Sequence, residues 1–285
     1  ILEKEEPKIM LIVDSDIDGF TSSAIFYKYT KDISPNVKID WLLHSGKQHG
    51  LQDHIDYLID CNIDYDLIVC PDSSSNDYEY HERLKELGIP VLVLDHHIVE
   101  KDCPLSDNAY IINNQLSENY KNKQLTGAGI VYQFCRYVDE ILSCSYSNQY
   151  IDLAALGIIG DMGSVLELEN RYIIKNGLEN IRNDFFWELM RKQGYSITGK
   201  MNPSDNEILE KMSPITTAFY IVPLVNAMIR VGSESEKARA FLAFIDGTQE
   251  VPSNKRGAKG TYEKVSVESA RECSNARNRQ NKTLE

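Results

Sequence analysis

The first 125 residues alternate short apolar runs with helical patterns, and this order is the feature that most constrains the fold. Apolar runs with the length of buried strands occupy residues 8–13, 38–43, 67–70, 91–94 and 109–112. Residues 21–29 and 78–87 carry helical patterns between them. Strands that alternate with helices are typical of a parallel sheet, and mostly apolar strands indicate cover on both faces. The sequence therefore predicts an α/β fold with a parallel, doubly wound sheet.

From residue 126 onward the pattern becomes helical. Helices are predicted at residues 127–141, 148–159, 170–181, 206–212, 215–229 and 234–245. Thr126 is a suitable N-cap for the first of them. Residues 246–260 are rich in Gly, Pro, Ser and Lys, which indicates a mobile loop, and the polar remainder has a helical pattern. We therefore divide the chain into an α/β core (residues 1–125), a helical part of the same domain (126–246) and a mobile loop with a long connecting helix (247–285).

The charge of the chain limits its surface chemistry. The 285 residues carry a formal net charge of −13, which argues against a broad nucleic-acid-coating surface. The segment from residue 254 onward is locally basic. Bound divalent cations would also change the sign of an acidic site. Composition therefore permits a phosphate-bearing substrate without predicting one.

Cysteine usage and hydropathy indicate a cytoplasmic location and no membrane. The six cysteines are scattered with no CxxC pair, a pattern of reduced thiols rather than of disulfides or a zinc site. No apolar run reaches the roughly 20 residues that span a bilayer. The first seven residues are charged and lead straight into an apolar run, unlike a secretory signal.

Acidic residues follow three of the predicted strands directly. Asp14, Asp16 and Asp18 come after residues 8–13, Asp72 comes after 67–70, and the run Asp95–His97 comes after 91–94. The carboxyl ends of parallel strands form the ligand crevice of an open sheet, so these groups should share one small volume. Such carboxylates would repel one another without cations. Carboxylate and imidazole ligands suit Mn²⁺ or Mg²⁺, and the absence of thiolates argues against structural zinc.

Each of these motifs alone has a simpler interpretation. The run Asp14–Gly19 could be a solvated turn or part of a calcium loop, but Ile25 stands where a calcium loop needs its Glu. Asp72 could cap a helix, the Asp-His-His run could start one, and Asp161 could be any loop acid. Their occurrence together at consistent structural positions favours a metal site.

At these residues the sequence resembles the DHH phosphoesterases, and within them the RecJ single-strand exonucleases. The first motif of that family is matched by residues 14–19, the third by Asp95-His96-His97 and the fourth by residues 155–161. Asp72 matches the second motif, although Ser73 and Ser74 replace the usual Asn-Gly or His-Gly.

Shorter segments favour the RecJ branch. Gly50-Leu51, residues 113–115 and residues 125–129 resemble RecJ segments. Residues 223–230 resemble the family's Pro-Arg-Ile-Asn-Ala-Ala-Gly-Arg, with Leu224 in place of its first Arg.

The resemblance implies two divalent cations, Mn²⁺ or alternatively Mg²⁺. The implied ligands are Asp14, Asp16, Asp18, Asp72, His96 and Asp161. Asp16 and Asp18 would each hold one ion and Asp72 would bridge them. His96 and Asp161 would complete the second ion's shell. Asp14 would support the first ion directly or through water, since Ile12 stands where some family members have a His ligand.

The resemblance also assigns roles beside the ions. His97 would contact the scissile phosphate, and Asp95 would orient an imidazole. Arg230 and Asn226 would bind a neighbouring phosphate, and His49 would lie near the substrate. A water deprotonated between the ions would attack phosphorus in line.

The expected function is that of a RecJ-like 5′-to-3′ exonuclease on single-stranded DNA in recombination or repair, with a replication or repair protein as a further partner. The alternatives are a phosphodiesterase for oligonucleotides or cyclic dinucleotides, and an inactive scaffold that binds nucleic acid or a replication partner. RecJ-like proteins continue after a long connecting helix into a second domain, which we expect to be absent from this sequence.

Overall fold

The computed structural model describes residues 4–60, 64–258 and 260–284. Its centre is a five-stranded sheet in the order β2-β1-β3-β4-β5, in which every pair is parallel. The strands are β1 (Lys8–Val13), β2 (Lys38–Leu43), β3 (Leu67–Pro71), β4 (Val91–Asp95) and β5 (Ala109–Asn113). All five predicted strands are confirmed, and three of them extend one residue further than predicted.

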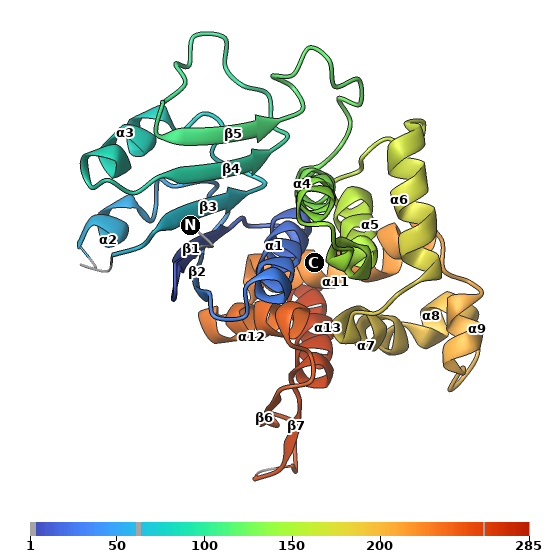
Figure 1. Cartoon of the computed structure of the whole chain (residues 1–285). Helices are drawn as coiled ribbons and strands as arrows, with labels where there is room; N and C mark the ends of the chain where they lie inside the picture. The colour runs from blue at the N-terminus through green and yellow to red at the C-terminus, as the bar shows by residue number, and fades with distance from the viewer. Residues whose placement is uncertain (1–3, 61–63, 259, 285) are drawn as a thin grey trace.

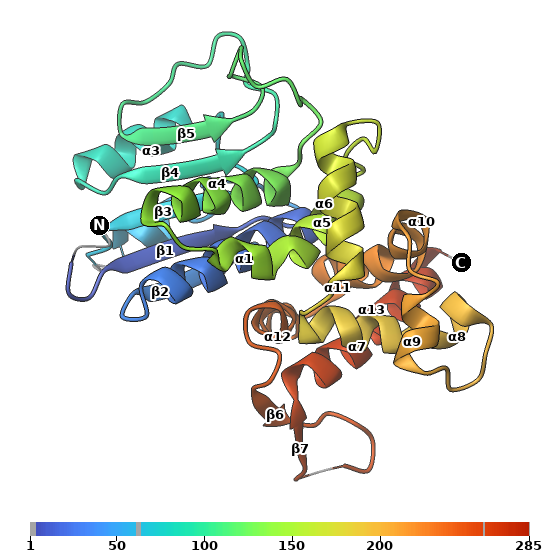
Figure 2. The ribbon, with the colours of Figure 1, turned by 45° about the vertical axis from the view of Figure 1, so that its right-hand side comes forward.

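Helices cover both faces of the sheet (Figures 1 and 2). Along β1, Ile9, Leu11 and Val13 pack in the same core cluster as α1 (Ile17–Ile33) and α4 (Gly127–Leu142). Met10 and Ile12 point to the other face, where the cluster includes α2 (Ile55–Asp60) and α3 (Tyr78–Glu86). This alternation confirms the doubly wound sheet.

The strand order places the ligand crevice. The chain passes from β1 to β2 on one side and then to β3 on the other. This reversal opens a crevice beyond the carboxyl ends of β1 and β3, where ligands bind in folds of this kind. Asp14 and Asp72 are the first residues after these two strands.

The second half of the described chain is mostly helical and lies beside the carboxyl ends of the strands (Figure 1). Its elements are η1 (Tyr146–Tyr150), α5 (Ile151–Gly160), α6 (Leu168–Glu179), α7 (Asp184–Lys192), α8 (Gly194–Thr198), α9 (Asp205–Leu209), α10 (Pro214–Thr216), η2 (Thr217–Ile221), α11 (Val222–Val231) and α12 (Glu234–Ile245). Helix α5 packs against α1, α4 and α6, which joins this half to the sheet.

The predicted helix at residues 215–229 is three elements in the structure. Pro223 has no N–H to donate to the carbonyl of Phe219, so a regular α-helix cannot run through this point. The chain takes a π-helical turn over Thr217–Ile221 instead, with the N–H of Val222 donating to the carbonyl of Thr217. π-Turns of this kind are frequent at functional sites.

The last part of the chain is more ordered than the predicted mobile loop. β6 (Glu250–Pro252) and β7 (Tyr262–Lys264) form an antiparallel hairpin that projects from the helical half (Figure 2). The following helix, α13 (Val265–Leu284), packs against α7, α11 and α12. Its small buried side chains, Ala270, Cys273 and Ala276, permit this close approach. The predicted connecting helix is therefore docked on the helical half.

One helical run of the described residues, Pro214–Val231, is long and apolar enough to cross a membrane by length and composition alone. It is 44% buried within the fold, and core helices pass the same test. Its last part, α11, packs against α13 in the core of the helical half.

Candidate metal centre

Asp14, Asp16 and Asp18 span the junction between β1 and α1. Asp16 caps α1, because its Oδ1 accepts the N–H of Gly19 at 3.0 Å. This cap starts the helix at Ile17, four residues before the predicted start. Asp18 therefore lies in the first helical turn and is fully buried.

The start of α4 holds Asp18 in place. The carboxylate of Asp18 accepts the backbone N–H groups of Gly127 (2.7 Å) and Ala128 (3.0 Å) and the hydroxyl of Thr126 (3.0 Å). The N-terminus of a helix favours negative charge. Thr126 is the N-cap residue, as predicted, but its side chain serves Asp18 rather than its own helix.

Asp72 stands immediately after β3 in a left-handed conformation, with φ of 65°. It is buried, and its N–H donates to the carbonyl of Leu94 at 2.8 Å. Ser74, in the place of the family's Gly, also has a positive φ of 80°. Non-glycine residues hold such conformations only where the surroundings impose them. Asp72 is therefore no helix cap, and the turn directs its carboxylate into the crevice.

Asp95 organises the Asp-His-His run. Its Oδ1 accepts the N–H groups of His96 (2.7 Å) and His97 (3.1 Å) and lies 2.7 Å from Nδ1 of His97. Its Oδ2 accepts the N–H of Ser75 at 3.1 Å. Burial alone would raise the pKa of Asp95, but these hydrogen bonds, chiefly from His97, hold it well below its usual value. Asp95 thus stays ionised, fixes the imidazole of His97 and holds the backbone of His96.

The six predicted ligands lie together in overlapping groups. Their ligand atoms approach within 4.8 Å of one another in groups of three: Asp14, Asp16 and Asp72; Asp18, His96 and Asp161; and Asp72 and His96 with His97. The last group joins the other two, since His96 Nε2 lies 3.1 Å from Asp72 Oδ1 and 3.6 Å from Asp161 Oδ2. This arrangement can hold two cations with Asp72 between them.

Several carboxyls of this cluster hold their protons more tightly than an ordinary aspartate does. Burial and the neighbouring acids raise the pKa of Asp18 to about 7 and that of Asp161 to about 6, and raise that of Asp72 well above its usual value. Burial lowers the pKa of His96 to about 4, so its imidazole is neutral near pH 7. A neutral imidazole beside carboxylates is the form that binds metals.

Two buried oxygen atoms support the fit of a divalent cation. Asp14 Oδ1 and Asp72 Oδ1 accept no hydrogen bond, although His96 Nε2 lies 3.1 Å from Asp72 Oδ1. Buried polar atoms without partners are rare in folded proteins. Hard oxygen ligands such as these suit Mn²⁺ or Mg²⁺.

The raised pKa values predict how stability depends on pH and cations. A group whose pKa is raised in the folded state stabilises the fold less as the pH climbs toward that pKa. This applies to Asp18 up to about pH 7, to Asp72, and to His97, whose pKa the hydrogen bond with Asp95 raises to about 9. We expect the melting temperature in EDTA to fall between about pH 6.5 and about pH 8.5. Mg²⁺ should raise it by about 5 °C at the higher pH.

Thermal unfolding at both pH values, with EDTA or Mg²⁺, checks this expectation. The gain from Mg²⁺ should be larger at the higher pH, because cations then replace fewer bound protons. An equal gain at both pH values would contradict the pKa assignment.

Two glycines make room for the carboxylates. A Cβ on Gly127 would lie 2.3 Å from Asp72 Oδ1, and one on Gly157 would lie 2.4 Å from Asp18 Oδ1. Sequence reasoning included both residues in matched segments but assigned them no role. The role of Gly157 could have been predicted from its position four residues, about one helical turn, before Asp161.

Replacing Gly127 by alanine should therefore displace the Asp72 carboxylate. We expect the Gly127→Ala variant to lose most of the stabilisation by Mg²⁺, measured by thermal unfolding. Gly129→Ala is the matched control in the same helix, because its Cβ would meet the apolar side chains of Leu125 and Ile158 instead of a carboxylate. Equal loss in both variants would show a general effect on α4 instead.

The three predicted substrate-binding residues have different surroundings. His49 Nδ1 lies 2.7 Å from Asp14 Oδ2, which places His49 at the metal centre. The side-chain oxygen of Asn226 accepts the N–H of Ile17 at 3.1 Å, so Asn226 braces the loop that carries the acids. Arg230 is exposed four residues further along α11, on the same face of the helix.

Hollows lie on both sides of His97. One of about 560 Å³ is lined by His49, Asp95 and residues 73–77 among others. The other, of about 270 Å³, is lined by His96, Asp161 and Met162 among others. Because His97 lines both hollows, a phosphate bound to His97 would lie between them.

Known proteins with similar sequences are exonucleases. A protein of Bacillus subtilis (strain 168), described as a putative SPbeta prophage-derived single-strand DNA-specific exonuclease YorK, is 41% identical over 260 residues, 91% of this chain and 42% of the relative. The single-stranded-DNA-specific exonuclease RecJ of Thermus thermophilus is 27% identical over 251 residues, 86% of this chain and 34% of the relative. The chain thus spans less than half the length of these relatives.

Solved structures share the fold. Exonuclease RecJ bound to manganese matches with a TM-score of 0.73 and 22% identity, over 96% of this chain and 62% of that chain. RecJ from Thermus thermophilus in complex with Mn²⁺ matches with a TM-score of 0.71 and 21% identity, over 96% of this chain and 35% of that chain. These likenesses confirm the predicted sheet and the helical half that follows it.

The family model for the DHH family, N-terminal domain, matches residues 8–158, more than half of the chain. The matched region contains the acidic motifs at the ends of β1, β3 and β4 and the start of α4 that holds Asp18. Of the predicted ligands only Asp161 lies beyond it. The chain therefore belongs to the DHH family.

Proposed function

We propose that this protein is a divalent-cation-dependent phosphodiesterase that degrades single-stranded DNA from its 5′ end. The observation that carries the proposal is the pair of ligand groups, Asp14, Asp16 and Asp72 in one and Asp18, His96 and Asp161 in the other. Two metals held by neighbouring groups of ligands are typical of enzymes that cleave phosphodiesters. The names of the relatives, which are single-strand-specific exonucleases, support the choice of substrate.

The side chains have distinct parts in this proposal. The six ligands would hold two cations, Mn²⁺ being the first choice because two solved RecJ structures contain it, with Mg²⁺ as the alternative. Bound cations supply an activated water and charge stabilisation for phosphoryl transfer. The hydrogen bond with Asp95 raises the pKa of His97 to about 9, so His97 is cationic near pH 7 and suited to contact the phosphate. Asp95 positions His97 and does not itself contact the substrate.

Further groups extend the phosphate-binding surface. His49 lies beside Asp14 and would face the substrate from the hollow that it lines together with His97. Arg230 would contact a neighbouring phosphate with the planar N–H groups of its guanidinium. Asn226 would hold the loop that carries the acidic ligands against α11.

The biological setting belongs to the same proposal. A cytoplasmic role in DNA recombination or repair, with a replication or repair protein as partner, would suit a single-strand exonuclease. Residues 1–246 would form one catalytic unit, and α13 would lead toward a second domain that closes over the site.

A nuclease assay tests the proposal directly. Long single strands labelled at the 5′ or the 3′ end are incubated with the protein in Mn²⁺ or EDTA. We expect 5′-labelled mononucleotides to appear first, and only with Mn²⁺. Cleavage limited to dinucleotides or cyclic dinucleotides would favour the oligonucleotide phosphodiesterase, and absence of any metal-dependent hydrolysis would overturn the enzymatic assignment.

A further inference from the structure

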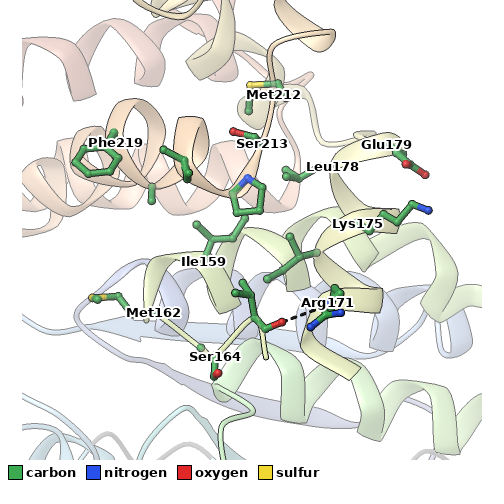
Figure 3. A pocket seen from close by; sticks show the side chains of 16 residues that line it. Ile159, Met162, Ser164, Arg171, Lys175, Leu178, Glu179, Met212, Ser213 and Phe219 are labelled. Carbon is green, nitrogen blue, oxygen red and sulfur yellow. Dashed lines mark hydrogen bonds between the residues drawn. The ribbon is translucent and has the colours of Figure 1, made fainter. Parts of the chain in front are cut away.

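An apolar groove of about 900 Å³ lies between α6 and the α10–η2 segment (Figure 3). Ile159, Ile174 and Leu178 are among the residues that line it. Two large apolar side chains on its α10–η2 wall are strongly exposed, Ile215 at 71% and Phe219 at 73%. Large apolar side chains that are exposed together beside a groove favour a binding site.

The groove is continuous with the metal centre. Met162 and Gly163 directly follow the ligand Asp161, and they line both the groove and the hollow beside His96. Met162 has a positive φ of 59° and is 88% exposed, so the turn after α5 presents an apolar side chain at the junction. In Figure 3, Phe219 and Met162 lie toward the same side of the groove.

The opposite side of the groove is charged. Arg171 and Lys175, one turn apart on α6, line it together with Glu179 (Figure 3). Arg171 is oriented by its Nε, which donates to the carbonyl of Val165 at 3.1 Å. The groove therefore combines apolar and aromatic surface with an edge that carries two cationic side chains and one carboxylate, which leaves that edge with a net positive charge.

Single-stranded DNA has the complementary character. Its unpaired bases offer apolar faces that stack on aromatic side chains, and its phosphates pair with Lys and Arg. An apolar protein helix would fit the apolar surface alone. The cationic edge and the opening at the metal centre favour the DNA strand, because a strand that places one phosphate beside His97 must send its next nucleotides along an adjoining surface.

Resting on the proposed function, we propose that this groove binds the bases of the nucleotides next to the scissile phosphate, with Phe219 as a stacking platform. The π-helical turn at Thr217–Ile221 presents Phe219 to the groove. Bases paired in a duplex cannot reach such a surface. The groove would thus contribute to selection of single strands, independently of the ligands that perform the chemistry.

Paired substrates and variants test this inference. The substrates are a 5′-phosphorylated oligothymidylate, the same strand with abasic residues near its 5′ end, and the small diester bis(p-nitrophenyl) phosphate. The variants are Phe219→Ala and, as control, Tyr110→Ala, which removes a 68% exposed aromatic side chain from β5. Hydrolysis in Mn²⁺ is measured as kcat/KM, and strand binding is measured by fluorescence anisotropy with Mn²⁺ replaced by Ca²⁺.

The wild type should prefer the base-containing strand over the abasic strand by about tenfold. Phe219→Ala should lose most of this preference and keep its rate on the small diester, whereas Tyr110→Ala should match the wild type. Equal rates of the wild type on both strands would overturn the inference. So would an equal loss on both strands in Phe219→Ala, which would instead point to a protein-docking or structural role for the groove.

The two proposals fail separately in this experiment. Absence of hydrolysis on every substrate would remove the proposed function, while base-dependent binding in the anisotropy measurement would still support the groove. Hydrolysis of all three substrates without any base dependence would support the proposed function and contradict the proposed role of the groove.

Discussion

Replacement of Asp72 by asparagine is expected to reduce the Mn²⁺-dependent hydrolysis of single-stranded DNA by more than about 100-fold. Removing a group that merely orients a metal ligand lowers affinity or activity by roughly 10- to 100-fold, and in the proposed site Asp72 would be a direct ligand of both cations. Its ligand atoms belong to the group with Asp14 and Asp16, and its Oδ1 lies 3.1 Å from His96 Nε2. Initial rates on a 5′-labelled strand measure the loss.

The same substitution should leave the fold intact or make it more stable without cations. Burial and the neighbouring acids raise the pKa of Asp72 well above its usual value, so its charged form is unfavourable in the cation-free protein. The neutral amide of asparagine removes that repulsion. We therefore expect Asp72→Asn to unfold at an equal or higher temperature than the wild type in EDTA near pH 8, and to gain little from Mg²⁺.

Asp152 provides the matched control. It is also a buried aspartate, on α5, and its carboxylate accepts the N–H groups of Leu153, Arg182 and Asn183 at 2.7 to 2.9 Å. Asp152→Asn should lower the melting temperature and keep the response to Mg²⁺, the reverse of the pattern at Asp72. If Asp72→Asn retained the wild-type rate, the assignment of the metal centre would be wrong.

The sheet is predictable from the sequence because its strands are covered on both faces. Each strand therefore appears as a short apolar run, and the acids after the runs mark the edge where ligands bind. Helix boundaries are less predictable. The cap formed by Asp16 starts α1 inside a stretch that resembles a turn, and α7 (Asp184–Lys192) was missed although Asn183 caps it with two accepted N–H groups.

The parts of the site that sequence reasoning missed depend on contacts between distant segments. Gly127 donates to Asp18 across 109 positions of the chain, and Ile17 donates to Asn226 across 209. A local sequence pattern cannot predict contacts between residues so far apart in the chain. The groove beside Phe219 is of the same kind, since its two walls come from α6 and η2 and the π-turn follows from where Pro223 falls.

Replacement of Asp95 by asparagine should move the pKa of His97 down. In the wild type the hydrogen bond with Asp95 raises the pKa of His97 to about 9. Asparagine removes the negative charge, so the pKa should fall toward the ordinary value of 6.5. At pH 8 the cationic fraction of His97 would then drop from about 90% to about 3%, roughly 30-fold. If cationic His97 binds the phosphate, activity at pH 8 should fall by a similar factor and recover as the pH is lowered.

NMR titration of the imidazole resonances in the cation-free protein measures the pKa of His97, and a pH profile of kcat/KM measures its consequence. Asp53→Asn is the control, because Asp53 lies 3.8 Å from the imidazole of His44, away from the ligands. That variant should keep the wild-type profile. A loss of activity in Asp95→Asn that is equal at all pH values would mean that Asp95 acts only by holding the backbone N–H groups of His96 and His97. If instead the fall of kcat/KM at high pH moves to a lower pH in Asp95→Asn, Asp95 acts through the charge of His97 and not only through the backbone. Because Asp53→Asn also removes one carboxylate beside one imidazole, an unchanged profile in that variant assigns the shift to His97.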